Sequence, residues 1–326
     1  LVAPENPGAV IEAVARADLI TATVTEKGYH LTAADQLDLS DPVIMAELRG
    51  EGLRSLIGYL AHGLARREAP VSVLSGDNRV GNGNVLEGAV RAFVATSDLS
   101  VDWGAVRFPN AMVDRITPAT TQAVRRQSGD PMAVPTEPYR EWVIEDRTVG
   151  PRPEWPGVHW VADVAPHELR KLRMLNGAHA LLAYAGIAAG HTYVHEAIAD
   201  PVLRDLALRL MREAEETVPP EGWVDGYAEA LIARFETPGL NHALRQIAMD
   251  GSQKVPYRFV GALRDRGGQG DALRAGLRAW MAFCAAEVAA GRRLDDPKAD
   301  QIAREVQSGD PDAALLRLVG AEQLAL

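Results

Sequence analysis

Residues 171 to 179 read Lys-Leu-Arg-Met-Leu-Asn-Gly-Ala-His, the densest group of reactive side chains in an otherwise apolar stretch. With Lys171 at zero, a helical advance of about 100° per residue places His179 near 80° and Asn176 near 140°. By the same arithmetic Glu168 falls at about 60°. An acid, an amine, an amide and an imidazole are therefore expected on one side of one helix.

Two interpretations of this segment are open. A lysine on a helix commonly lies at the solvent-exposed edge, and a histidine is commonly an interior residue whose hydrogen bonds are made within the protein. Polar groups in apolar surroundings are also costly to bury without partners or a ligand, and such clusters mark functional sites. The rest of the chain has to distinguish the two.

The composition bounds the class of protein. The 326 residues suit one large or two ordinary domains, and 47% hydrophobic with 24% charged residues is typical of soluble globular proteins. A net charge of -10 argues against a nucleic-acid partner, because phosphate contacts need clustered Lys and Arg. Cys284 is the single cysteine, which suits a reducing compartment. Without an apolar run of roughly 20 residues or a signal peptide, we expect a cytoplasmic monomer or small homo-oligomer with no membrane partner.

Strand and helix patterns alternate in the first half of the chain. Residues 19–25 and 71–75 are rich in β-branched residues and predict strands, and a helical period over 85–94 follows. Residues 106–116 predict one edge strand, because Pro109 cannot donate to a ladder. Such alternation implies parallel pairing, with ligands bound beyond the carboxyl ends of the strands. The polar residues at these ends, which are also common in ordinary turns, are Glu26, Lys27, Asp77 and Asn78.

After residue 160 the sequence has helical periodicity to its end, with breaks at Pro and Gly pairs. We therefore predict an α/β Rossmann-like domain with a connecting region over residues 1–158, and an all-helical substrate domain over 159–326. No Gly-x-Gly-x-x-Gly follows a predicted strand, and the sequence does not begin with Met. The N-terminal, Gly-rich part of the Rossmann-like domain is accordingly expected to be missing.

Five segments, in order along the chain, resemble the polyol-specific long-chain dehydrogenases, the family that contains mannitol 2-dehydrogenase and fructuronate reductase (D-mannonate oxidoreductase). The Lys-x4-Asn-x2-His signature of 171–179 is specific, and Asp-Gly-Ser-Gln-Lys at 250–254 also matches the family. Segments 171–179 and 247–254 look more like the fructuronate reductase branch than the mannitol branch. The resemblance implies a nicotinamide cofactor, NAD with NADP not excluded. The other matching segments are 23–29, 75–78 and 108–116.

The resemblance also implies roles for individual residues. Lys171 would take the hydroxyl proton as hydride leaves for nicotinamide, with no metal required. Asn176 and Asn78 would donate to the developing alkoxide. His179 would hold the substrate oxygen or orient Lys171, and Glu168 would pass the proton to solvent.

The substrate implied by the family is a polyol or a uronate. Asp114 would accept from a sugar hydroxyl or, equally, pair with an arginine. A uronate carboxylate favours cationic partners, for which Lys254, Arg258 and Arg245 are candidates, each of which could instead be a surface charge. We expect interconversion of D-mannonate and fructuronate, with mannitol and fructose as the alternative pair.

Two alternative hypotheses assign the chain to other classes of protein. His191 and His195 are spaced i, i+4 as zinc ligands on a helix face are, although the order His-Glu-x-x-His is absent. Without a Gly-rich half, the chain could also be a truncated binding module that does no catalysis.

Overall fold

The computed structural model describes residues 2–24, 26–32 and 34–324, apart from the side chain of Glu26. The chain divides into two compact units. The first consists of Leu1–Asp114 and Arg140–Ala165, and the second of Arg115–Tyr139 and Pro166–Leu326. Residues 115–139, which separate the two segments of the first unit in sequence, therefore pack with the helices of the second.

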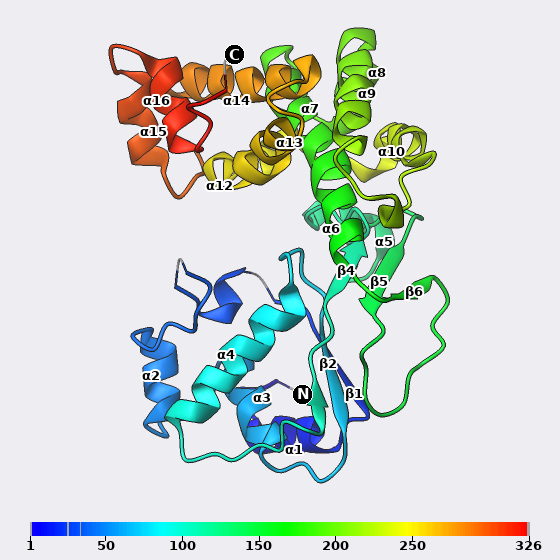
Figure 1. The fold of residues 1–326 in the computed structure, drawn as a ribbon, viewed down its shortest axis with the longest axis vertical. Helices are drawn as coiled ribbons and strands as arrows, with labels where there is room; N and C mark the ends of the chain where they lie inside the picture. The colour runs from blue at the N-terminus through cyan, green and yellow to red at the C-terminus, as the bar shows by residue number, and fades with distance from the viewer. Residues whose placement is uncertain (1, 25, 33, 325–326) are drawn as a thin grey trace. The chain divides into compact units, whose positions relative to one another are not determined.

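A parallel sheet with strand order β1-β2-β3 organises the first unit. β1 (Leu19–Ala22) pairs with β2 (Val71–Ser75), which pairs on its other side with β3 (Val106–Arg107). Every residue of β2 is buried, as expected for a central parallel strand covered on both faces. The helices of this unit, which Figure 1 shows in blue to cyan, are α1 (Pro7–Arg16), α2 (Pro42–Leu48), α3 (Leu56–Leu64) and α4 (Asn82–Thr96).

A second sheet in the same unit has the order β4-β5-β6. β4 (Ala111–Asp114) runs antiparallel to β5 (Glu141–Glu145), which is parallel to β6 (Val158–Val161). The prediction of one edge strand over residues 106–116 was wrong, because Pro109 lacks an N–H and separates β3 from β4, which belong to different sheets.

The second unit is helical, as predicted. Its central helix α7 (Asn176–Ala188) has nine of its 13 residues buried and packs against α14 (Asp271–Ala289), beside which it lies in Figure 1. A helix that is apolar all round is stable only inside a core. Among the described residues no helix is both long and apolar enough to cross a membrane. The helices are α5 (Gln122–Ser128), α6 (Ala165–Arg170), α7 (Asn176–Ala188), α8 (Val194–Ala199), α9 (Pro201–Glu215), α10 (Tyr227–Phe235), α11 (Leu244–Ile247), α12 (Gly251–Val255), α13 (Gly261–Asp265), α14 (Asp271–Ala289), α15 (Ala299–Val306) and α16 (Pro311–Leu318).

Two π turns interrupt these helices. The first π turn (Lys171–Leu175) joins α6 to α7, and the second π turn (Pro256–Val260) joins α12 to α13. The two turns pack against each other inside the second unit. Such single π turns are rare and occur frequently at functional sites.

Candidate active site

The first π turn changes the geometry expected for the Lys-x4-Asn-x2-His signature. The backbone N–H of Asn176 donates to the carbonyl of Lys171, an i→i+5 bond that places the two residues one above the other. The separation of about 140° expected from α-helical arithmetic was therefore wrong. From Asn176 onward the helix is α-helical, so His179 lies about 60° from Asn176. Amine, amide and imidazole converge more closely than the sequence predicted.

His179 is the most buried member of this group. Its side chain is 5% exposed, and Nε2 has no hydrogen-bond partner in the structure. Phe235 lies against the ring, with 4.4 Å between ring centroids. Lys171, Asn176 and Glu168 are half-buried, so each remains within reach of solvent or a ligand.

Several cationic or basic groups surround His179. Burial holds the pKa of His179 well below its usual range, and the electrostatic influence of His242, Arg258, Arg234 and Lys171 lowers it further. Burial also lowers the pKa of His242. Both imidazoles are therefore neutral at neutral pH, and His179 can accept as well as donate a hydrogen bond.

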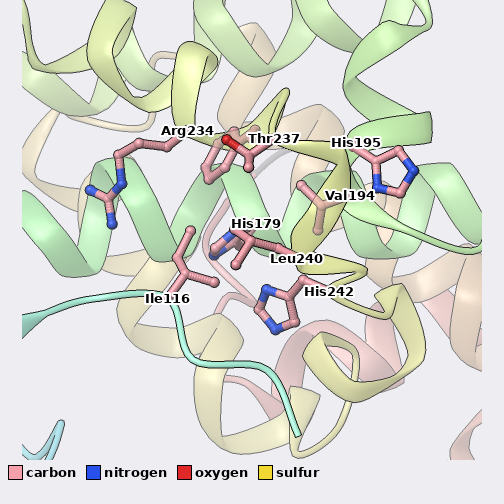
Figure 2. Close-up of a pocket in the computed structure, with 9 residues that line it drawn as sticks. Ile116, His179, Val194, His195, Arg234, Thr237, Leu240 and His242 are labelled. Atoms are coloured by element: carbon pink, nitrogen blue, oxygen red, sulfur yellow. The ribbon is translucent and has the colours of Figure 1, made fainter. Parts of the chain in front are cut away.

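His179 lies in the wall of a small pocket within the second unit. Figure 2 shows the rings of His179 and His242 next to each other, with His195 farther toward the edge. The ring centroids of His179 and His242 are 5.3 Å apart, and the rings are nearly perpendicular. The pocket is lined by Ile116, His179, Val194, His195, Arg234, Phe235, Thr237, Leu240 and His242.

A buried ion pair fixes one side of this pocket. Arg234 donates to both oxygens of Glu137, at 2.9 and 2.7 Å, and both side chains are less than 10% exposed. Glu137 also accepts from the backbone N–H of Ile116 at 2.6 Å. Removing one partner of such a pair leaves a buried charge without compensation. Glu137, Arg234 and His242 could not be predicted from the sequence, because they are connected to the signature only through space.

The second π turn carries one of the predicted anion-binding residues, Arg258, and α12 just before it carries another, Lys254. Arg258 is half-buried, and burial lowers its pKa against the opposing influence of Tyr184 and Asp250. Lys254, four residues earlier, donates to the carbonyl of Met249 at 2.7 Å and lies 3.5 Å from the carboxylate of Asp250.

Arg245 lies in a different environment. Its side chain is 59% exposed and donates to Glu287 at 3.1 Å. Glu287 is shared with Arg292, which lies 2.6 Å away. Among the three predicted anion-binding residues, Lys254 and Arg258 thus share one helical segment, whereas Arg245 belongs to this separate ion-pair group.

Two glycines explain why these segments approach so closely. A Cβ at Gly177 would lie 3.3 Å from Leu210 and 3.6 Å from the carbonyl of Arg258, so α7 contacts the second π turn there. A Cβ at Gly251 would lie 2.5 Å from Nε1 of Trp280, a distance that real Cβ atoms do not show. A side chain at position 251 would therefore displace Trp280, whereas one at position 177 would require Leu210 to move by a few tenths of an ångström.

The predicted cofactor residues lie at the carboxyl ends of β1 and β2 in the first unit. The ends are adjacent, since Gly76 N–H donates to Ala22 O at 2.8 Å and Tyr29 Oη is 2.6 Å from Ser75 Oγ. Asp77 accepts from the backbone N–H of Arg79 at 3.0 Å, and its other carboxylate oxygen has no partner in the described structure. Lys27 and Asn78 are exposed, whereas the side chain of Glu26 lies outside the described part of the chain.

The start of α4 suits a phosphate-bearing cofactor. Gly81 precedes it with a φ of 62°, and the backbone N–H of Asn84 in its first turn donates to Asn110 Oδ1 at 3.0 Å. A Cβ at Gly83 would lie 2.5 Å from the carbonyl of Phe108, so the helix lies close against the strand region. A helix start that follows a parallel strand is a common binding site for anionic phosphates. These residues therefore fit a dinucleotide.

Asp114 is buried at the end of β4, in register with Glu141.

The zinc hypothesis fails on geometry, because α8 begins only at Val194. His191 precedes the helix and lies 3.6 Å from Asp200, while His195 stacks on Tyr193. Within the described ranges no three His, Cys, Asp or Glu side chains gather as metal ligands.

A parallel sheet whose strands are followed by polar residues, together with a helical unit that carries a lysine, an amide and an imidazole close in sequence, is typical of nicotinamide-dependent dehydrogenases. Two family models match the chain, the mannitol dehydrogenase Rossmann domain over residues 2–157 and the mannitol dehydrogenase C-terminal domain over 163–322. The chain belongs to the mannitol dehydrogenase family and is an oxidoreductase of that family.

Relatives with different substrates resemble the chain to similar degrees. It is 40% identical to D-mannonate oxidoreductase of Escherichia coli, with 97% of this chain and 72% of the relative covered. It is 35% identical to mannitol 2-dehydrogenase of Pyrenophora tritici-repentis, over 95% of this chain and 60% of the relative. The chain thus spans between three fifths and three quarters of these relatives.

Solved structures agree with the fold. A D-sorbitol dehydrogenase in substrate-free form superposes with a TM-score of 0.80 at 26% identity, covering 98% of this chain and 75% of that one. A ternary complex of Pseudomonas fluorescens mannitol 2-dehydrogenase with NAD and D-mannitol gives 0.78 at 28% identity, covering 99% and 76%.

Proposed function

We propose that this protein is an NAD-dependent secondary-alcohol dehydrogenase that interconverts a sugar acid and its keto form, with D-mannonate and fructuronate as the preferred pair. The observation that carries the proposal is the convergence of Lys171, Asn176 and His179 near Arg258 of the second π turn. NADP is a second candidate cofactor, because no residue described here discriminates between the two.

The cofactor would be held by the first unit. Asp77 and Lys27 follow the two adjacent parallel strands, where dinucleotides bind in such sheets. The start of α4 would face the pyrophosphate. When bound, the nicotinamide accepts the hydride from the alcohol carbon or returns it to the ketone.

The proton would be handled by the second unit. Lys171 takes the hydroxyl proton, and Glu168 passes it to solvent. Asn176 donates to the oxygen as negative charge develops, and Asn78 is the second predicted amide donor. His179 is neutral and buried, so it holds the substrate oxygen without adding a competing positive charge.

The preference for an acid over a neutral polyol rests on Lys254 and Arg258. The two side chains are four residues apart on one helical segment, and Arg258 is close enough to His179 to influence its pKa. A carboxylate is a favourable partner for a half-buried guanidinium. Asp114 is the proposed acceptor for a sugar hydroxyl.

A substrate panel with a charge-removing variant tests this proposal. We expect kcat/KM to be higher for D-mannonate than for mannitol, and higher for fructuronate than for fructose. Lys254→Met should lower kcat/KM for the acid pair by about tenfold, the effect of one charged hydrogen bond, and change the neutral pair far less. The matched control is Lys298→Met on an exposed site. Equal losses for acid and neutral substrates would contradict the carboxylate contact, and a preference for mannitol would favour the mannitol 2-dehydrogenase alternative.

A further inference from the structure

Two polar atoms in the wall of the small pocket have no hydrogen-bond partner among the described residues. They are Nε2 of His179 and Nδ1 of His242, both buried and both in the second unit. A buried ring nitrogen without a hydrogen bond is costly, because water that solvated it in the unfolded chain has been removed. His179 and His242 line the same pocket, so one small ligand group bound there can form a hydrogen bond with each of the two nitrogens.

Two other polar side chains of the wall make contacts of their own. The guanidinium of Arg234 is held by both oxygens of Glu137, which neutralises its charge. The ring of His195 stacks on Tyr193, with 5.6 Å between centroids. Much of the remaining wall is apolar and consists of Ile116, Val194, Phe235 and Leu240.

The size and charge of the pocket limit the ligand group. Its volume is about 10 Å³, close to what one water molecule needs. Both imidazoles are neutral and the neighbouring arginine is paired, so nothing in the wall favours an anion. A carboxylate would bring a charge that no group of the wall neutralises, whereas an uncharged hydroxyl group suits the two neutral imidazoles.

We propose that His242 is a second substrate-binding residue, which together with His179 binds one hydroxyl group of the sugar chain. A neutral imidazole has one donor and one acceptor nitrogen, and a hydroxyl group donates once and accepts twice. One of the two orphan nitrogens donates to the hydroxyl oxygen, and the hydroxyl proton is donated to the other. The identity of the ligand as a sugar acid or polyol rests on the proposed function. The carboxylate of an acid substrate is assigned to the separate group of Lys254 and Arg258.

A titration that does not depend on turnover tests the binding. The full chain, labelled with nitrogen-15 in histidine, is titrated with D-mannitol and with D-mannonate, with and without NAD. We expect Nδ1 of His242 and Nε2 of His179 to shift together with both sugars. His191, whose ring is paired with Asp200 outside the pocket, should not move. A shift of His179 without His242, or no shift of either at saturating sugar, would overturn the proposal.

Kinetics of matched variants test the role in recognition. His242→Leu removes the ring nitrogen, whereas His242→Asn keeps a polar atom near the position of Nδ1. We expect His242→Leu to raise KM about tenfold, as for the loss of one buried hydrogen bond, with kcat within about twofold. His242→Asn should recover most of the loss, and the control His191→Leu should leave KM unchanged.

Monodeoxy substrates separate binding from a merely structural effect. One monodeoxy analogue of the preferred ketose should lose about tenfold in KM with the native protein and nothing further with His242→Leu. If every analogue is discriminated equally by both proteins, His242 contacts no hydroxyl. If no sugar is turned over at all, the proposed function fails, and the nitrogen-15 titration alone decides on His242.

Discussion

The two π turns of the second unit have the same backbone pattern but different origins. In the second π turn, Pro256 is the first residue, and its ring and missing N–H prevent an α-helix from continuing through it. The first π turn contains neither Pro nor Gly. It is accompanied by long-range contacts of Arg173, which pairs with Asp265 at 2.6 Å and donates to Thr217 O at 3.1 Å. The second π turn thus has a cause in the local sequence, whereas the first forms together with long-range contacts of the folded unit.

The difference corresponds to a difference in proposed task. The first π turn aligns Lys171 with Asn176, the groups assigned to proton transfer and oxyanion stabilisation. The second carries Arg258, assigned to substrate charge. Changes in the first turn are therefore expected to affect kcat, and changes in the second to affect KM.

The largest expected effect comes from the first turn. Lys171→Met should lower kcat by about 1000-fold, the middle of the range for loss of a general base, because no other amine of the signature can replace it. KM should change little, and the melting temperature should stay within a few degrees. The comparison variant is Lys298→Met. Turnover near the native rate in Lys171→Met would remove this amine from the mechanism.

An intermediate effect is expected from the second turn. Pro256→Ala restores an N–H and permits an α-helical turn, which would rotate Arg258 away from its present position. KM for an acid substrate should rise by about three- to tenfold, as for one weakened charged contact, while kcat is retained.

The matched control is Pro311→Ala at the first position of α16, where the missing N–H has no intrahelical partner in any case. Equal effects of the two substitutions on KM would show that the second π turn does not position the substrate.

The smallest expected effect concerns pH and the buried imidazole next to the first turn. The pKa of His179 is lowered in the folded protein, so below about pH 6.5 the unfolded chain takes up a proton that the folded chain does not. The free energy of unfolding should fall by up to about 1.4 kcal/mol per pH unit for each such histidine as pH decreases through this window.

Urea unfolding at pH 7.5 and 5.5 measures this dependence, and His179→Leu should reduce it. Carboxylates such as Glu287, whose pKa is lowered to about 2, contribute below their usual value near 4.5 and therefore outside the window. The same pH dependence in His179→Leu as in the native chain would assign the effect to other groups.

The general fold followed from local patterns. Alternation of β-branched runs with helical periods predicted β1, β2 and α4 and the helical second unit, because strand and helix periods are local properties of the chain. The prediction failed over residues 106–116. There Pro109 predicts an edge strand, whereas in the structure it separates β3 from β4, which belong to different sheets.

The sequence by itself determined the family signature, the two-part architecture and the presence of Lys171, Asn176 and His179 within three turns of helix, since spacing along a helix is read directly from the chain. Only the tertiary structure decided how these residues converge. The π turn that stacks Lys171 with Asn176 accompanies contacts made by Arg173 with residues more than 40 positions away, and His242 reaches His179 only through packing. Such contacts depend on distance in space, which no local period encodes.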